Sequence, residues 1–140
     1  FMFGMTKKQF LKKSKKCLKD TGIELLIIRE IINQETRGSV GLDESCQKME
    51  NIRKNLEEIF FQYEKLNPPS KCKKIHFKLL NTIIILQESV VANTEYLNLL
   101  KDGLKEPAQD KLEKSIDKLE KFREKYYEII REVDLNLKPR

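Results

Sequence analysis

The feature that most constrains this fold is a repeat of apolar residues every three or four positions, which runs through four long segments of the 140-residue chain. In the second segment, Met49, Ile52, Leu56, Ile59 and Tyr63 follow one another at steps of three and four. This spacing matches the 3.6 residues of an α-helical turn and places the apolar side chains on one face. We therefore expect amphipathic helices that bury that face against one another.

Local start signals place these helices over residues 6–36, 43–66, 70–102 and 107–133. Thr6 and Gln9 have the spacing of a capping box, and Asp43 is a favourable N-cap residue. Pro107 is acceptable at a first helical position because its missing N–H has no partner there. Residues 1–5 and 135–140 are expected to be loose.

Glycine and proline mark the other boundaries. Segment 37–42 contains two glycines, and the Asn-Pro-Pro at 67–69 ends the second helix because a residue before proline leaves the helical region. Gly103 is placed to follow the C-terminus of the third helix. Gly22, inside the first segment, leaves open a kink or break in that helix.

The connections between the four helices are short, which predicts antiparallel neighbours. We expect an all-α, antiparallel up-down-up-down four-helix bundle that forms a single domain over residues 1–140. The third helix should be the most buried. Its main apolar stripe includes Leu79 and Leu86, and a second line would widen this stripe through Ile75, Leu80, Ile84, Val91 and Tyr96.

The formal net charge of +6 is concentrated in two lysine-rich stretches. They comprise Lys7, Lys8, Lys12, Lys13, Lys15, Lys16 and Lys19 in the first helix, and Lys71, Lys73, Lys74 and Lys78 at the start of the third. Folding the chain back at each connection brings both stretches to the same end of the bundle. A basic end of this kind suits an anionic surface, whether lipid headgroups or nucleic acid, although a solvated lysine-rich helix start is the simpler interpretation.

The sequence does not decide between a cytoplasmic location and an extracytoplasmic, membrane-associated one. The longest unbroken apolar runs, such as 25–28 and 83–86, have four residues, against about 20 for a membrane-spanning helix. The chain begins with Phe1 rather than methionine, so a leader could have been removed.

Few side chains have the types and spacing that catalysis or metal binding needs. His76 is the only histidine, and with Cys72 at i,i+4 it leaves open a small-molecule or metal site, although zinc normally takes four ligands. Three cysteines without a CxxC pair suggest buried thiols, and the register leaves open a disulfide between Cys17 and Cys72. We expect no cofactor and no enzymatic activity.

Residues 66–90, LNPPSKCKKIHFKLLNTIIILQESV, resemble a pattern in small uncharacterised helical-bundle proteins of Gram-positive bacteria, many of them lipid-anchored outside the cell. The resemblance rests on Pro69, His76, Leu79 and Leu80 and covers 25 residues. It implies a non-enzymatic surface protein tethered at its N-terminus, although no lipobox cysteine is visible.

These observations predict a non-catalytic bundle with a binding or structural role, either with a protein partner or at an anionic membrane or cell surface. A nucleic-acid-associated bundle is a less favoured alternative, because arginine is scarce in the basic stretches and nucleic-acid readers use it heavily. The sequence does not decide whether the chain forms a homo-oligomer. An exposed second apolar stripe on the third helix would indicate that it does.

Overall fold

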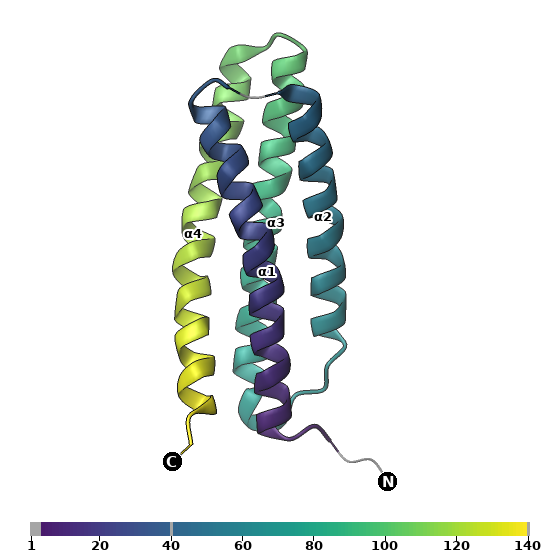
Figure 1. The fold of residues 1–140 in the computed structure, drawn as a ribbon, viewed down its shortest axis with the longest axis vertical. Coiled ribbons are helices and arrows are strands. Elements are labelled where there is room, and N and C mark those ends of the chain that lie inside the picture. The colour runs from purple at the N-terminus through teal and green to yellow at the C-terminus, as the bar shows by residue number, and fades with distance from the viewer. Residues whose placement is uncertain (1–3, 40, 140) are drawn as a thin grey trace.

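The computed structural model describes residues 4–39 and 41–139, and most of them are helical (Figure 1). Four long helices pack together, and one turn of 3-10 helix, η1, directly precedes the third of them. Their bounds are α1 Lys7–Thr36, α2 Leu42–Glu64, η1 Ser70–Cys72, α3 Lys73–Lys101 and α4 Lys105–Leu137. The described residues contain no strand. The prediction of an all-α bundle of four helices is therefore confirmed.

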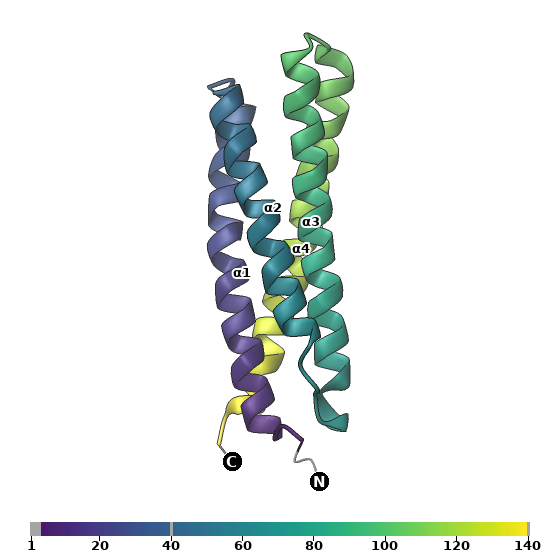
Figure 2. The ribbon, with the colours of Figure 1, turned by 90° about the vertical axis from the view of Figure 1, so that its right-hand side faces the viewer.

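Each helix packs against two neighbours. α1 contacts α2 and α4, α3 contacts the same two helices, and the α3–α4 contact is the most extensive. α1 and α3 lie across the bundle from each other and touch only slightly. In Figure 1 both termini and η1 lie at one end, whereas the α1–α2 and α3–α4 connections lie at the other. Figure 2 shows that α3 and α4 extend beyond the α1–α2 connection at that second end.

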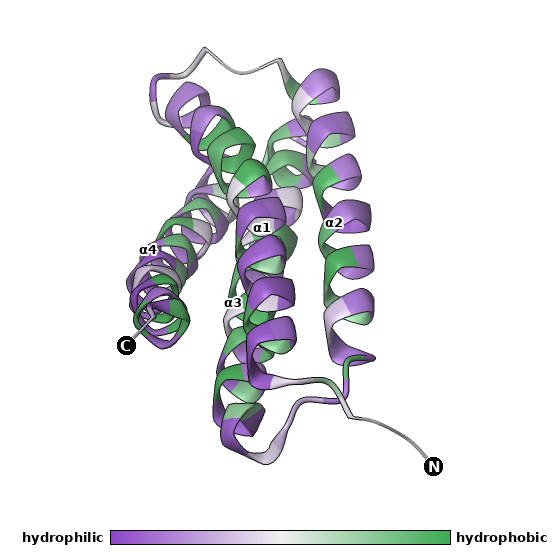
Figure 3. Cartoon of the chain, turned by 60° about the horizontal axis from the view of Figure 1, so that its bottom comes forward, coloured by the Kyte–Doolittle hydropathy of each residue, from purple (hydrophilic) through white to green (hydrophobic). Residues whose placement is uncertain are grey.

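The core is built from the predicted apolar stripes. Phe10, Met49, Leu86 and Phe122, one from each helix, are all completely buried. Figure 3 shows the same division, with hydrophobic faces turned inward and hydrophilic faces outward. Full burial of a large apolar side chain contributes about 1.5–3 kcal/mol, so these stripes are the main stabilising element of the fold.

Two of the predicted helix boundaries have the expected chemistry. The Gln9 amide donates to Thr6 Oγ1 at 3.1 Å and the Thr6 amide donates to Gln9 Oε1 at 3.0 Å, which completes the predicted capping box. Gly103 follows α3 with a φ of +76°, and Gly38 follows α1 with a φ of +72°. Glycine is favoured at both positions because other residues rarely adopt this left-handed conformation.

The starts of three helices differ from the prediction. The helix expected from residue 70 opens with the 3-10 turn Ser70–Cys72, and α3 itself begins at Lys73. Gly41, not Asp43, is the N-cap of α2, since the helix already begins at Leu42, which packs against the core. Asp43 lies in the first turn instead, where its charge still favours the helix dipole. Pro107 is the third residue of α4 rather than the first. Proline is tolerated there because the N–H groups of the first turn have no partner within the helix.

The ends of two helices differ as well. α4 continues to Leu137, four residues past the predicted end, because Val133 is buried and Leu137 packs against the core. Residues 135–137, expected to be loose, are therefore helical. α2 ends at Glu64, two residues early, while Leu66 still packs against the core.

The first helix runs through Gly22 without a break. A Cβ at this position would lie 2.5 Å from the hydroxyl oxygen of Tyr126 in α4, so the glycine makes room for that side chain. Tyr126 donates its hydroxyl hydrogen to the Leu18 carbonyl oxygen at 2.6 Å. Gly22 is thus explained by close packing of α1 against α4 and not by a kink.

The outer face of α3 is more apolar than predicted. Leu79, Ile83 and Leu86 are completely buried, but Ile84 is 40% exposed and Val91 is 52% exposed. The prediction that these two residues widen the buried stripe is wrong, because each lies one position after a core residue and so points about 100° away from it. The continuous helical stretch Ser70–Lys101 is long and apolar enough to cross a membrane by length and composition alone, as core helices of bundles often are.

Candidate functional site

All eleven lysines of the two predicted stretches are exposed. They lie on the first turns of α1, on η1 and at the start of α3, which Figure 1 places at the end of the bundle that carries the termini. α1 contacts η1 directly, so the two stretches adjoin. We call these residues the basic end: Lys7, Lys8, Lys12, Lys13, Lys15, Lys16, Lys19, Lys71, Lys73, Lys74 and Lys78.

Part of the basic end forms a row along α1. Lys8, Lys12, Lys15 and Lys19 follow at steps of four, three and four, so they lie on one side of the helix over about 16 Å. The opposite side of the same turns holds the buried Phe10 and Cys17. The row is therefore held in place by the core contacts of α1 while its ammonium groups face solvent.

Most of these lysines lack an intramolecular partner. Lys15 pairs with Asp134 at 3.2 Å, Lys16 with Asp20 at 2.7 Å and Lys78 with Glu132 at 3.2 Å. The other eight form no ion pair with any residue in the described ranges 4–39 and 41–139. All three pairs are well exposed, and such pairs contribute at most about 1 kcal/mol, so an external anion can compete with them.

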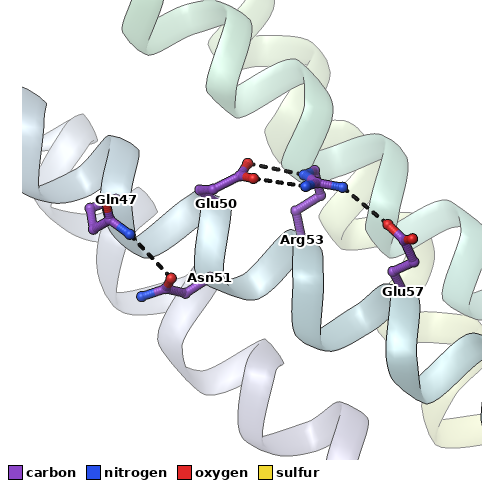
Figure 4. A network of polar contacts seen from close by, with 5 residues as sticks. All are labelled: Gln47, Glu50, Asn51, Arg53 and Glu57. Carbon is purple, nitrogen blue, oxygen red and sulfur yellow. Dashed lines mark hydrogen bonds and ion pairs between the residues drawn. The ribbon is translucent and has the colours of Figure 1, made fainter.

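Some charges elsewhere on the bundle are paired along their own helix. Figure 4 shows Arg53 of α2 bound through two nitrogens to Glu50, at 2.7 and 3.0 Å, and through a third to Glu57, at 3.1 Å. This guanidinium lowers the pKa of the Glu50 carboxyl through a direct hydrogen bond. Beside it, the Gln47 amide donates to Asn51 at 3.2 Å. The basic end is therefore distinguished by the density of its lysines, because exposed lysines elsewhere, such as Lys54 and Lys105, also form no ion pair within the described residues.

Beneath the lysines, a polar and aromatic cluster joins three helices. The hydroxyls of Ser14 in α1 and Tyr63 in α2 lie 2.7 Å apart, and His76 Nε2 of α3 lies 2.9 Å from the Tyr63 carbonyl oxygen. The rings of Phe10, Tyr63 and His76 pack with centroids 4.9–5.8 Å apart. These contacts fix the relative positions of the helix ends that display the lysines.

The sequence left open a small-molecule or metal site at Cys72 and His76 and a disulfide between Cys17 and Cys72, and the contacts of this cluster bear on both. His76 has a structural partner, Cys72 is completely buried, and no three His, Cys, Asp or Glu side chains within the described residues could share a metal ion. All three cysteines are free thiols. Burial raises the pKa of the Cys17 thiol to about 12, which makes it a poor nucleophile.

A second buried network lies toward the far end, and the sequence did not single out its carboxyl. Glu35 of α1 and Asn93 of α3 are 4% and 0% exposed. The Asn93 amide donates to Glu35 Oε1 at 2.8 Å and to the Ser115 hydroxyl of α4 at 3.2 Å. Ser89 and Ser115 each donate to the other's carbonyl oxygen, at 2.7 and 2.9 Å. Asn93 is therefore a central core residue.

The buried network around Glu35 and Asn93, which we call the far network, has two oxygen atoms without a hydrogen-bond partner within the described residues. Glu35 Oε2 and Asn93 Oδ1 are buried and have no hydrogen-bond partner among residues 4–39 and 41–139. Burial raises the pKa of the Glu35 carboxyl to about 7, although the hydrogen bond from Asn93 acts to lower it. A proton on Glu35 removes the buried charge and turns one of two unpartnered acceptors into a donor, so this network favours the neutral acid.

No protein-family model, curated protein or solved structure was found to match this chain.

Proposed function

We propose that this protein is a non-catalytic helical bundle that attaches through its basic end to an anionic membrane surface. The observation that carries the proposal is the presence of both lysine-rich stretches at one end, with eight of their eleven ammonium groups free of ion pairs within the described residues. Lysines close to an anionic bilayer contribute about 1 kcal/mol each. A few of them acting together would therefore give substantial binding.

We also infer an up-down-up-down connectivity in which neighbouring helices are antiparallel. The short connections and the placement of both termini with η1 at one end support it. In this connectivity residues 7–19 and 71–78 adjoin, although more than 50 positions separate them in sequence. The basic end would then exist only in the folded chain.

The chemistry of the basic end favours lipid headgroups over nucleic acid. None of the chain's arginines lies in either lysine-rich stretch, and specific nucleic-acid contacts rely on arginine forks and on stacked aromatic rings. Lysine ammonium groups act as point charges, which suits a diffuse layer of phosphate and carboxylate groups. The resemblance of residues 66–90 to lipid-anchored bundle proteins agrees with this choice.

Vesicle co-sedimentation tests the proposal. We expect the chain to bind phosphatidylserine-containing vesicles, to ignore phosphatidylcholine vesicles, and to dissociate as salt is raised from low to physiological concentration and above. Equal binding to both lipids, or no binding at low salt, would contradict the proposal. Tighter binding to duplex DNA than to anionic vesicles at the same salt would favour the nucleic-acid alternative instead.

A pair of matched variants locates the contact. Lys8, Lys12 and Lys19 form no ion pair within the described residues, and their triple change to glutamine should lower the vesicle partition coefficient about 100-fold. The control K54Q/K105Q/K114Q removes the same charge from exposed sites elsewhere and should change it far less. A larger loss in the control would place the contact outside the basic end.

A further inference from the structure

The outer face of α3 carries an apolar row that the bundle does not cover. Phe77, Ile84 and Val91 are 67%, 40% and 52% exposed and follow one another at intervals of seven residues. A seven-residue interval keeps side chains on one side of a helix, where they can form the seam of a two-helix contact. Leu80, partly buried, lies between the first two and broadens the row.

The side of this row toward α4 is polar and already ordered. On the side toward α4, Lys78 pairs with Glu132, Glu88 with Lys118 at 3.4 Å, and Glu95 with Lys111 at 2.9 Å. An apolar centre with a polar rim is the usual composition of a protein–protein contact. The row is therefore arranged as an interface and not as a scatter of single exposed residues.

The distribution of charge along α3 indicates in which direction a second copy of α3 would lie on this face. The first half of its outer face carries Lys73 and Lys74, whereas the second half carries Glu88 and Glu95, whose pairs with Lys118 and Lys111 are exposed enough for a second copy to compete with them. A second α3 lying parallel would set lysine against lysine and glutamate against glutamate. A second α3 lying antiparallel would set each basic half against an acidic half.

The positions of these residues also fit a two-fold axis at Ile84. Phe77 and Val91 each lie seven residues from Ile84. If Ile84 of one chain faces Ile84 of the second, Phe77 of each chain therefore faces Val91 of the other. Lys73 and Glu95 lie eleven residues to either side and face each other in the same way. Such self-complementarity is what an isologous two-fold contact requires.

We propose that the outer face of α3 is the interface of an antiparallel two-fold dimer of this chain, with Ile84 at its centre and Lys73 opposite Glu95 of the second copy. An anionic lipid surface fits this face less well, because Glu88 and Glu95 lie along it. Lys73 and Lys74 belong to both the basic end and this face, but the inference does not depend on membrane attachment, since the lysine row of α1 takes no part in it. A dimer of this kind would present one basic end at each of its two ends.

Sedimentation equilibrium on the full chain tests the dimer. We expect the mass to rise with concentration from the 16.6 kDa of the monomer toward twice that value. The change I84E would place two carboxylates at the two-fold axis, and we expect the variant to sediment as a monomer at concentrations where the unaltered chain is mostly dimeric.

The matched control for I84E is L26E, which changes a residue of α1 that is 64% exposed and lies outside α3. It should leave the mass distribution unchanged. A monomer at every concentration up to the solubility limit, or a dimer that L26E disrupts and I84E does not, would overturn the proposal. Circular dichroism establishes that each variant remains helical.

A charge exchange tests the antiparallel register. K73E and E95K should each weaken the dimer several-fold, because each places like charges opposite one another twice. The double variant K73E/E95K restores opposite charges and should regain most of the lost affinity. Absence of this rescue, with the single variants still folded, would contradict the proposed register. Vesicle binding by I84E should be unaffected, so failure of the dimer and failure of the membrane proposal are separable.

Discussion

The two ends of the bundle differ in where they hold charge. The basic end displays eleven lysines in solvent, and the cluster beneath them, built around Ser14, Tyr63 and His76, is hydrogen-bonded. Toward the far end Lys101 pairs with Asp43 at 3.0 Å, and the interior encloses the carboxyl of Glu35. One end thus carries uncompensated charge outside, and the other carries an ionisable group inside.

This difference has physical consequences for what each end can do. Exposed charge costs little stability and is free to attract an anionic partner. A buried carboxyl costs stability whenever it is ionised, and so it makes the fold sensitive to pH instead. We therefore expect changes at the far end to act mainly on stability and changes to the lysines of the basic end to act mainly on binding.

The largest expected effect on stability is that of Asn93→Leu. This change removes the amide that donates to Glu35 and to Ser115, and it leaves the carboxyl without a donor within the described residues. We expect a loss of about 4 kcal/mol in the free energy of unfolding at pH 8, measured by denaturant titration. The exposed Asn81→Leu on the same helix is the control and should cost little. A loss below about 1 kcal/mol for Asn93→Leu would show that the far network is not stabilising.

Glu35→Gln isolates the pH dependence. The pKa of Glu35 is about 7 in the folded chain, above the ordinary 4.5, so the folded state retains a proton that the unfolded state releases. Stability from this group is complete below about pH 4.5 and is lost as pH rises through 7.

We therefore expect the unaltered chain to lose about 2–3 kcal/mol relative to Glu35→Gln between pH 5 and pH 8. Unfolding titrations of both proteins at the two pH values measure this difference. Parallel pH profiles for the two proteins would contradict the buried placement of Glu35.

Tyr63→Phe should have the smallest effect of the three. It removes the hydroxyl that meets Ser14, but the Ser14 hydroxyl keeps the Phe10 carbonyl oxygen as an acceptor at 3.0 Å. We expect a loss of about 1 kcal/mol in unfolding free energy at pH 8 and no change in vesicle binding. A loss as large as that of Asn93→Leu would mean that the two ends do not differ in the way described.

Much of the fold was predictable because apolar spacing and capping chemistry are local. The Thr6–Gln9 capping box and the glycine after α3 follow from residues a few positions apart. The role of Gly22 could not be predicted, since it depends on Tyr126, which lies 104 positions away in the sequence. The extension of α4 to Leu137 likewise depends on core contacts that the helix's own sequence does not reveal.

The candidate site was predictable to the same extent. Lysine density and chain reversal were enough to place both basic stretches at one end. Sequence could not show that Ile84 and Val91 face solvent, because a helix with apolar residues on most sides gives no indication of which side meets its neighbours. Nor could it reveal Glu35, whose burial depends on Asn93 in another helix.

The central claim is that the two lysine-rich stretches act as one surface, and K71Q/K74Q tests it most directly. These two lysines are exposed and form no ion pair within the described residues. Partition onto anionic vesicles should fall about 30-fold in K71Q/K74Q and about 100-fold in K8Q/K12Q/K19Q, while K54Q/K105Q/K114Q remains close to the unaltered chain. If K71Q/K74Q binds as tightly as the unaltered chain, the stretch at the start of α3 takes no part and the claim is wrong.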